Sequence, residues 1–429
     1  MNDAYRTPGV YVEQTRPVDA PTFPTGVPVF VGFVEDSHQT GGEGEALPAP
    51  RFLTRWEQFG PFVGHAHRRG FLDYAVRGFF ENGGGRCVVV PLQMWQREPS
   101  AVLQHVFEEG GLLDDVEDTD LVCVPDAMME PEAAYQVQRA VLEHCRRKRD
   151  RFAILDAVPI HGAGHAANVR IDAIGIQTVI EHWRALLPGE GALYFPWLCV
   201  KPWPRSEYSQ AAGRADHDAS VHTRDNGPTA GGIDMVAVPP CGHVAGIYAR
   251  TDRRVGVHKA PANEIVEGVL DLETEVTDED QGVLNEVGVN CLRRFSGRGI
   301  RVWGARTLSG QPGWRYVNVR RLFLALTRWA ERNLHEFVFE PNTAPLWERV
   351  RYRLASYCYG LFQQGALKGE EPAEAYYVKC DAETNPLEVR EAGQLIAEVG
   401  LAAVAPAEFV IVHITQSSAQ VSVSILVGP

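Results

Sequence analysis

Phe71-Leu-Asp-Tyr-Ala-Val-Arg-Gly-Phe-Phe-Glu-Asn-Gly-Gly-Gly-Arg-Cys-Val-Val-Val-Pro-Leu92 contains the pattern that decides the fold. Its apolar residues recur at helical spacing up to Asn82, the three glycines predict the end of a helix, and 87–92 is an apolar strand. The succession returns with helical patterns at 99–109, 130–148 and 179–187 and strands at 121–125, 152–158 and 193–200. Short apolar strands separated by helices are typical of a parallel sheet covered on both faces. We therefore predict an α/β fold, with 27–34 as another buried strand.

The last third of the chain has a different pattern. Residues 319–332 and 345–367 predict two long amphipathic helices, and Pro345 suits the first turn of the second one. Strand patterns follow at 375–380, 409–415 and 420–427, and the last two alternate apolar and polar residues. The short polar link between these two predicts a hairpin.

Composition limits the classes of function. The chain has 429 residues, 45% of them hydrophobic, which is enough for a large core and two or more structural units. Its net charge of −14 argues against non-specific binding to nucleic acid or anionic membranes. No apolar run approaches the roughly 20 residues of a membrane helix, and no secretory signal is expected. The eight cysteines occur singly, so we expect buried, reduced thiols.

Three patterns suggest chemistry at first sight. The glycines after Asn82 close a helix and precede a strand, which is the reverse of the order in a phosphate-binding loop. His161 and His165 stand in a Gly-rich stretch unlike a helical zinc motif. Asp156 ends a predicted strand, but the chain has no Gly-x-Ser-x-Gly nucleophile motif, and Ser296 and Ser309 lie in turns. We therefore assign no catalytic, cofactor-binding or metal-binding residue and expect no enzymatic activity.

Charge is distributed unevenly along the chain. Between residues 293 and 353 there are thirteen Arg, no Lys and four Glu, a formal charge of +9, so the rest of the chain carries −23. A basic segment of this kind predicts contact with an acidic partner. The alternative is that several of these arginines pair internally with residues 271–286, which contain seven acids and no base. The span lacks the features of a nucleic-acid-binding module.

The two ends of the chain carry short strand patterns. Val10, Tyr11, Val12 and Glu13 follow a Thr-Pro-Gly turn signal, and residues 420–427 end almost at the last residue. Such strands leave edge hydrogen-bonding groups to satisfy, either within one chain or by adding to the sheet of another chain. The pattern leaves both options open.

Three blocks of sequence resemble the tail sheath proteins of contractile phages, R-type pyocins and extracellular contractile injection systems. The first is Tyr5-Arg-Thr-Pro-Gly-Val-Tyr-Val-Glu13. The second is Pro239-Pro-Cys-Gly-His-Val-Ala-Gly-Ile-Tyr-Ala-Arg-Thr-Asp252, followed by Val257-His-Lys-Ala-Pro-Ala-Asn263. The third spans 285–308 and contains Gly288-Val-Asn290 and Gly304-Ala-Arg-Thr-Leu308. Residues 35–235 match only loosely.

The resemblance implies a domain organisation. Residues 1–20 would be an arm with an exchanged strand, 21–285 a subtilisin-like α/β domain without protease activity, and 286–429 an α+β domain that faces an inner tube. The N-terminal strand would complete this last domain. The strands exchanged between subunits would comprise Val10, Tyr11, Val12 and Glu13 at one end, and Val421, Val423, Ile425 and Val427 at the other.

The resemblance also implies a function and partners. The chain would polymerise as a helical sheath of stacked, hexameric rings around an inner tube, with baseplate, terminal cap and sheath paralogues as further partners. It would assemble in the bacterial cytoplasm, belong to a virion tail or tail-like particle, and be released on lysis. For the tube contact we predict Arg320, Arg321, Arg328 and Arg332, opposed to an acidic tube exterior. The alternatives are an inactive subtilisin-fold binding module and an unrecognised hydrolase.

Overall fold

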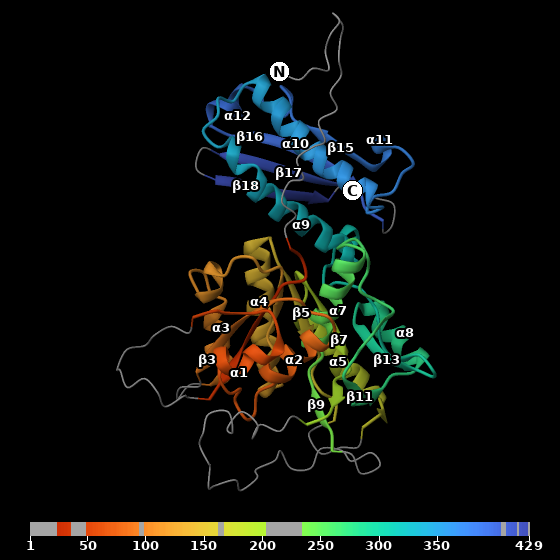
Figure 1. The fold of residues 1–429 in the computed structure, drawn as a ribbon. Helices are drawn as coiled ribbons and strands as arrows, with labels where there is room; N and C mark the ends of the chain where they lie inside the picture. Colours follow the sequence, from red (N-terminus) through yellow and green to blue (C-terminus); the bar gives the residue numbers. More distant parts are fainter. Residues whose placement is uncertain are drawn as a thin grey trace, which may run out of the picture.

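A computed structural model describes residues 24–35, 49–93, 98–161, 167–202, 234–404, 409–417 and 420–427, with the last two ranges described by their backbone alone. Figure 1 shows two parts, a large α/β body and a smaller unit built from the C-terminal residues. The predicted arm strand at Val10–Glu13 and the polar stretch 203–232 lie outside the described residues. In the part of the chain that is described, no helix combines the length and the apolar composition needed to cross a membrane.

The body is organised around a nine-stranded sheet with the order β10-β14-β13-β7-β5-β4-β1-β3-β2. From β13 to β3 all neighbours are parallel, and the strands at both edges are antiparallel, so the predicted parallel sheet is confirmed for its centre. The strands are β1 (Pro28–Val34), β2 (Arg51–Leu53), β3 (Cys87–Gln93), β4 (Leu121–Cys123), β5 (Phe152–Asp156), β7 (Gly191–Phe195), β10 (Glu264–Ile265), β13 (Asn290–Phe295) and β14 (Gly299–Trp303).

Helices cover both faces of this sheet. Helices α2 (Leu72–Glu81) and α7 (Cys241–Arg254) share a core with Phe30 of β1, whereas α3 (Pro99–Val106), α4 (Ala134–Lys148), α5 (Ala173–Ala185) and α8 (Asp278–Val287) share the other core with Val29 and Val31. Successive side chains of a strand point to opposite faces of the sheet. Because helices bury both faces here, the side chains of the central strands are largely apolar, as the sequence pattern indicates.

Smaller elements complete the body. Strands β8 (Leu198–Val200), β9 (Val236–Val238) and β11 (Val269–Leu272) form a second sheet, β6 (Val169–Arg170) pairs with β12 (Thr274–Glu275), and α1 (Phe59–Val63) lies near the β2 edge. The cysteines are free and buried, as predicted. Gly83 has a φ of +93° and follows Asn82, the C-cap of α2, which confirms that the glycines close a helix.

The C-terminal unit begins with α9 (Val317–Asn333) and α10 (Ala344–Gln363), which pack with Leu395, Ala397 and Val399 of a four-stranded antiparallel sheet. This sheet has the order β15 (Tyr376–Lys379), β16 (Leu395–Ala402), β17 (Phe409–Ser417) and β18 (Gln420–Val427), and α11 (Pro372–Ala375) and α12 (Leu387–Glu391) flank it. The predicted hairpin is confirmed, since β17 and β18 pair antiparallel from Ser417–Gln420 outward.

The predicted domain boundary at residue 285 is wrong. Strands β13 and β14 belong to the central sheet of the body, so the body continues to at least Trp303. The boundary was implied by the resemblance, and no strand pattern was recognised in the sequence between residues 286 and 303.

Candidate functional site at the junction of the two parts

Helix α9 presents the predicted arginines to acidic residues at the amino ends of the body's strands. Glu190 immediately precedes β7 and pairs with Arg320, and Asp120 immediately precedes β4 and pairs with Arg321. Arg332, in the last turn of the helix, pairs with Asp118. The amino edge of the sheet is therefore covered by a basic helix.

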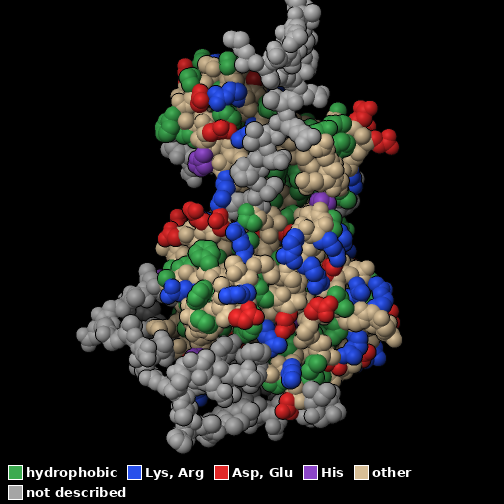
Figure 2. Space-filling model, viewed as in Figure 1, with side chains coloured by type: hydrophobic (Ala, Val, Ile, Leu, Met, Phe, Trp, Pro, Cys, Tyr) green, Lys and Arg blue, Asp and Glu red, His purple; other side chains and the backbone are tan. Residues whose placement is uncertain are grey.

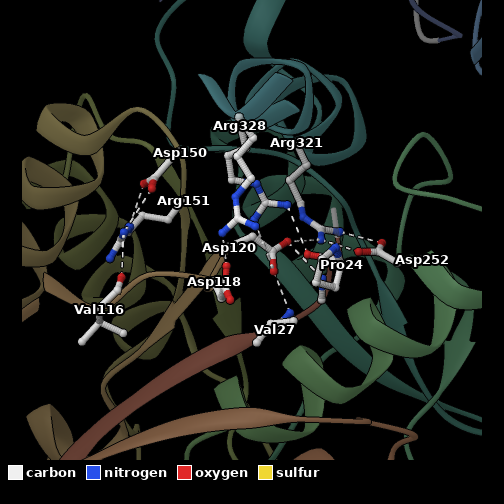
Figure 3. A network of polar contacts seen from close by, with 12 residues as sticks. Pro24, Val27, Val116, Asp118, Asp120, Asp150, Arg151, Asp252, Arg321 and Arg328 are labelled. Atoms are coloured by element: carbon white, nitrogen blue, oxygen red, sulfur yellow. Dashed lines mark hydrogen bonds and ion pairs between the residues drawn. The ribbon is translucent and has the colours of Figure 1, made fainter. Parts of the chain in front are cut away.

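Arg321 is the centre of this cluster (Figure 3). Its Nη1 and Nη2 donate to the two carboxylate oxygens of Asp252 at 2.9 and 2.6 Å, and Nη2 also donates to Oδ2 of Asp120 at 3.0 Å. Its guanidinium carbon lies 4.7 Å from the ring centroid of Tyr248, a cation–π distance. Burial alone would lower the pKa of Arg321, but Asp252 and Asp120 outweigh it and raise the pKa, so the side chain stays charged.

Asp120 also holds the chain where it enters the body. Its Oδ2 accepts a hydrogen bond from the backbone N–H of Gly26 at 3.0 Å, and its Oδ1 accepts one from the backbone N–H of Val27 at 2.6 Å. Arg328, on the same face of α9 as Arg321 and two turns further along, donates to the carbonyl oxygen of Pro24 at 3.4 Å and has its Nη1 3.8 Å from Oδ1 of Asp120. A single carboxylate, on the residue directly before β4, therefore contacts both the two residues that lead into β1 and helix α9.

The burial of these arginines corrects the predicted tube contact. Arg320, Arg321 and Arg328 are buried and engaged with groups of their own chain, so as placed here they present no charge to a partner's surface. Of the four, only Arg332 has a largely exposed side chain, at 51%. The prediction is wrong for the three buried residues because a charge count along the sequence does not reveal partners that are distant in sequence.

The alternative of internal pairing with 271–286 is confirmed for part of the basic span. Arg293 pairs with Asp278 and Arg294 with Asp271. On the face drawn in Figure 2, acidic and basic side chains are interspersed over both parts. Many of the arginines in the basic span 293–353 therefore make contacts within the chain.

The carboxyl edge of the sheet holds two buried carboxylates that bind backbone groups. Asp156, at the end of β5, accepts a hydrogen bond from the backbone N–H of Cys241 at 2.7 Å and thereby holds the start of α7. Burial raises the pKa of Asp156 to about 7. Asp126, after β4, accepts from the backbone N–H of Phe33 at 2.6 Å and of Phe71 at 2.5 Å.

The two histidines considered in the sequence show no sign of a metal site in the part of the chain that the structure describes. The backbone N–H of His161 donates to Glu273 at 2.8 Å, and His165 lies outside the described residues. Among the residues that the structure describes, no three His, Cys, Asp or Glu side chains gather as a metal site.

The second sequence block owes its pattern to helix packing. It forms α7, and Gly242 and Gly246 lie against α2 so closely that a Cβ on Gly242 would stand 2.1 Å from the carbonyl oxygen of Ala75. Asp252, the last residue of the block, is one of the partners of Arg321. Sequence reasoning missed the roles of Asp120 and Asp252; the available signals were an acid directly before an apolar strand and an acid at the end of the block.

The terminal strand 420–427 pairs along one edge with β17, and within the described residues β18 forms the outer edge of its sheet. The pairing of Val421, Val423, Ile425 and Val427 is thus with the neighbouring strand of the same chain. Exchange of this strand, and of Val10–Glu13, between subunits stays a prediction.

The chain is similar to known sheath proteins. Residues 113–308 match the family described as phage tail sheath protein central domain. The tail sheath protein of Salmonella phage ViI is 27% identical over 172 residues, which cover 38% of this chain but 26% of that protein, so the match spans about a quarter of its length.

Two solved structures match nearly from end to end. The helical sheath of the anti-feeding prophage in its contracted state is 30% identical, with 94% of this chain and 98% of that chain covered and a TM-score of 0.65. The sheath of the extracellular contractile injection system PVC, also contracted, is 29% identical, with 95% and 96% covered and a TM-score of 0.66.

Proposed function

The chain belongs to the family of contractile tail sheath proteins, and on that premise we propose that it polymerises helically around an inner tube and contracts to drive the tube through a target envelope. The observation that carries the proposal is the 30% identity and matching fold over 94% of this chain in a helical sheath. The mixed α/β fold agrees with that role. The protein is a structural component of a virion tail or a tail-like particle.

Subunits are held together by exchanged strands in this proposal. Within the described residues β18 is an edge strand, and an edge presents N–H and C=O groups that a strand from a second copy can satisfy. Val10–Glu13 is the second strand that pairs with a neighbour. Identical head-to-tail contacts of this kind extend into a helix without closing.

Contraction needs no nucleotide in this scheme. Energy is stored when the subunits assemble around the tube in an extended, metastable lattice, and it is released as the bodies rotate into closer contact while the exchanged strands stay paired. The partners are further copies in stacked hexameric rings, the tube protein, a baseplate and a terminal cap, and sheath paralogues where they exist. Assembly takes place in the bacterial cytoplasm, and lysis releases the particle.

The body has a structural role, and we interpret it as a subtilisin-like domain without catalysis. Asp156 and Asp126, the carboxylates at the edge where α/β enzymes bind ligands, hold backbone N–H groups of α7, β1 and α2. For the tube contact, Arg332 remains the candidate of the original four because its side chain is exposed. Exposed ion pairs are individually weak, about 0.2–1 kcal/mol, which suits a contact that must release.

Electron microscopy of the purified full chain, alone and mixed with its tube protein, tests the proposal. Hollow helical cylinders are expected. Persistent monomers at high concentration with the tube present would refute the sheath role and favour a soluble binding module.

A chain that ends at residue 419 tests strand exchange separately. It lacks β18, the edge strand, and is expected to keep its circular dichroism spectrum but to form no cylinders. If this truncated chain builds cylinders as well as the full chain does, strand exchange through β18 is wrong although the sheath role stands.

A further inference from the structure

We propose that Asp120 is an anchor that ties the chain at Pro24–Val27 to both parts of the subunit at once, so that a pull on the preceding residues is carried into the body and into α9 together. The inference rests on the proposed function, in which those preceding residues pair with a neighbouring subunit. The new element of the inference is the side chain to which a force on the preceding residues is transmitted.

The first element of the anchor is a fixed path of the backbone into the sheet. Gly26 and Val27 both donate to Asp120, and the backbone N–H of Asp120 in turn donates to the carbonyl oxygen of Val27 at 3.0 Å. Gly26 has a φ of +71°, and a Cβ there would stand 2.5 Å from the Cα of Ala249. The chain therefore turns tightly against α7 directly before β1, where a side chain would be excluded.

The second element is the connection to α9. Arg321 bridges Asp120 and Asp252 from the face of α9 that meets the body, and Arg328 reaches the carbonyl oxygen of Pro24. The opposite face of α9 contributes Phe323 and Ala330 to the core of the C-terminal unit. Hydrogen bonds between charged groups in a buried network are stronger than neutral ones, and they act as a unit.

These two elements place Asp120 between the incoming chain and the helix shared by the two parts. Figure 3 shows Arg321 and Arg328 descending from α9 toward Asp120 while Val27 approaches it from the opposite side. Displacement of Pro24–Val27 requires breaking contacts to the body and to α9 together. An anchor made only of β1 pairing would leave α9 unaffected.

Asp126 provides a matched control. Like Asp120, it is a buried carboxylate that flanks β4 and accepts hydrogen bonds from two backbone N–H groups. One of these, that of Phe33, belongs to β1, whereas the donors to Asp120 directly precede β1. It lies at the opposite end of the strand, at the carboxyl edge, away from the amino edge that α9 covers. Asp120→Asn and Asp126→Asn therefore cause similar chemical changes at the two ends of one strand.

Hydrogen–deuterium exchange of the purified, unassembled full chain, read by mass spectrometry with residue-level fragmentation, tests the anchor. Asp120→Asn is expected to speed exchange at the amides of Gly26 and Val27 by at least about tenfold, and to speed exchange within α9 as well. Asp126→Asn is expected to act near Phe33 and Phe71 and to leave α9 at its original rate. The anchor is refuted if Asp120→Asn leaves Gly26 and Val27 unchanged, or if both variants affect α9 equally.

Arg321→Lys keeps the test decisive if Asp120→Asn does not fold. Lysine retains the positive charge but lacks the planar guanidinium that donates to two carboxylates at once. Residue 321 makes no direct contact with the amides of Gly26 and Val27, so any effect on them passes through Asp120. Faster exchange at Gly26 and Val27 in this variant supports coupling through Asp120, and unchanged exchange there contradicts it. The exchange measurements use unassembled protein, so they test the anchor independently of assembly. If the original chain formed no cylinders, the proposed function would be overturned, whereas the anchor would still be decided by the exchange rates.

Discussion

Replacing Arg321 with methionine removes a guanidinium that lies between two buried carboxylates. The Arg321 side chain is 3% exposed, and its two partners, Asp120 and Asp252, are 7% and 2% exposed. Methionine fills much of the volume of the arginine stem but donates no hydrogen bond. Asp252 then loses both of the bonds it receives from Arg321, and Asp120 loses one.

The expected cost is about 3–5 kcal/mol, the range for removing one partner of a buried ion pair and leaving the other unpaired. Loss of the cation–π contact with Tyr248 adds to it. Arg332→Met is the matched control, because it removes an Arg–Asp pair from the same helix. The side chains of that pair, Arg332 and Asp118, are 51% and 43% exposed, so the expected cost is less than about 1 kcal/mol.

Urea denaturation at pH 7, followed by circular dichroism, measures both variants against the original chain. The Arg321→Met transition is expected at clearly lower urea than that of Arg332→Met. A double variant, Arg321→Met with Asp252→Asn, is expected to recover part of the loss because it removes one of the stranded charges. Equal, small effects of Arg321→Met and Arg332→Met would refute the assignment of Arg321 to a buried network.

Two further predictions concern the packing of α7. Because burial raises the pKa of Asp156 from 3.8 to about 7, the folded state binds more protons than the unfolded state in that range, so this group lowers stability as pH rises from about 4 to 7. Asp156→Asn, whose amide oxygen can still accept from Cys241, is expected to gain stability relative to the original chain over that range, by up to about 4 kcal/mol; a constant difference in unfolding free energy across pH would contradict this. Gly242→Ala is expected to cost about 1–3 kcal/mol of stability by overpacking against Ala75. Gly282→Ala, in an open position of α8, is expected to stabilise the protein by less than about 1 kcal/mol. Thermal denaturation compares the two variants, and equal melting temperatures would count against the close contact of Gly242.

The helices and strands of the body could be predicted from sequence because their periodicity is local. The strands at 121–125 and 152–158 contain β4 and β5, and α9 extends the predicted helix at 319–332 by two residues at its start and one at its end. The domain boundary failed because it was taken from the resemblance, and the local pattern at β13 and β14 does not reveal which sheet these strands join.

The arginines of α9 show the limit of charge counting. Arg321 pairs with acids 69 and 201 residues away, and Arg320 pairs with an acid 130 residues away. Nothing near these residues in sequence indicates such partners. The acids at 271–286 were recognised as possible partners because they form a dense cluster, whereas Glu190 is a single acid before a strand and Asp120, at the end of the acidic run 114–120, was not considered.

The sequence alone determined the alternation of helices and apolar strands, the hairpin near the C-terminus and the resemblance to contractile sheath proteins, because each is carried by residues close together along the chain. Only the tertiary structure decided what the arginines of α9 contact. The path of the chain brings the amino ends of β1, β4 and β7 to one edge of the sheet and lays α9 across them. A guanidinium buried at that edge is removed from water and must be paired with an opposite charge, and the carboxylates of the same chain provide it.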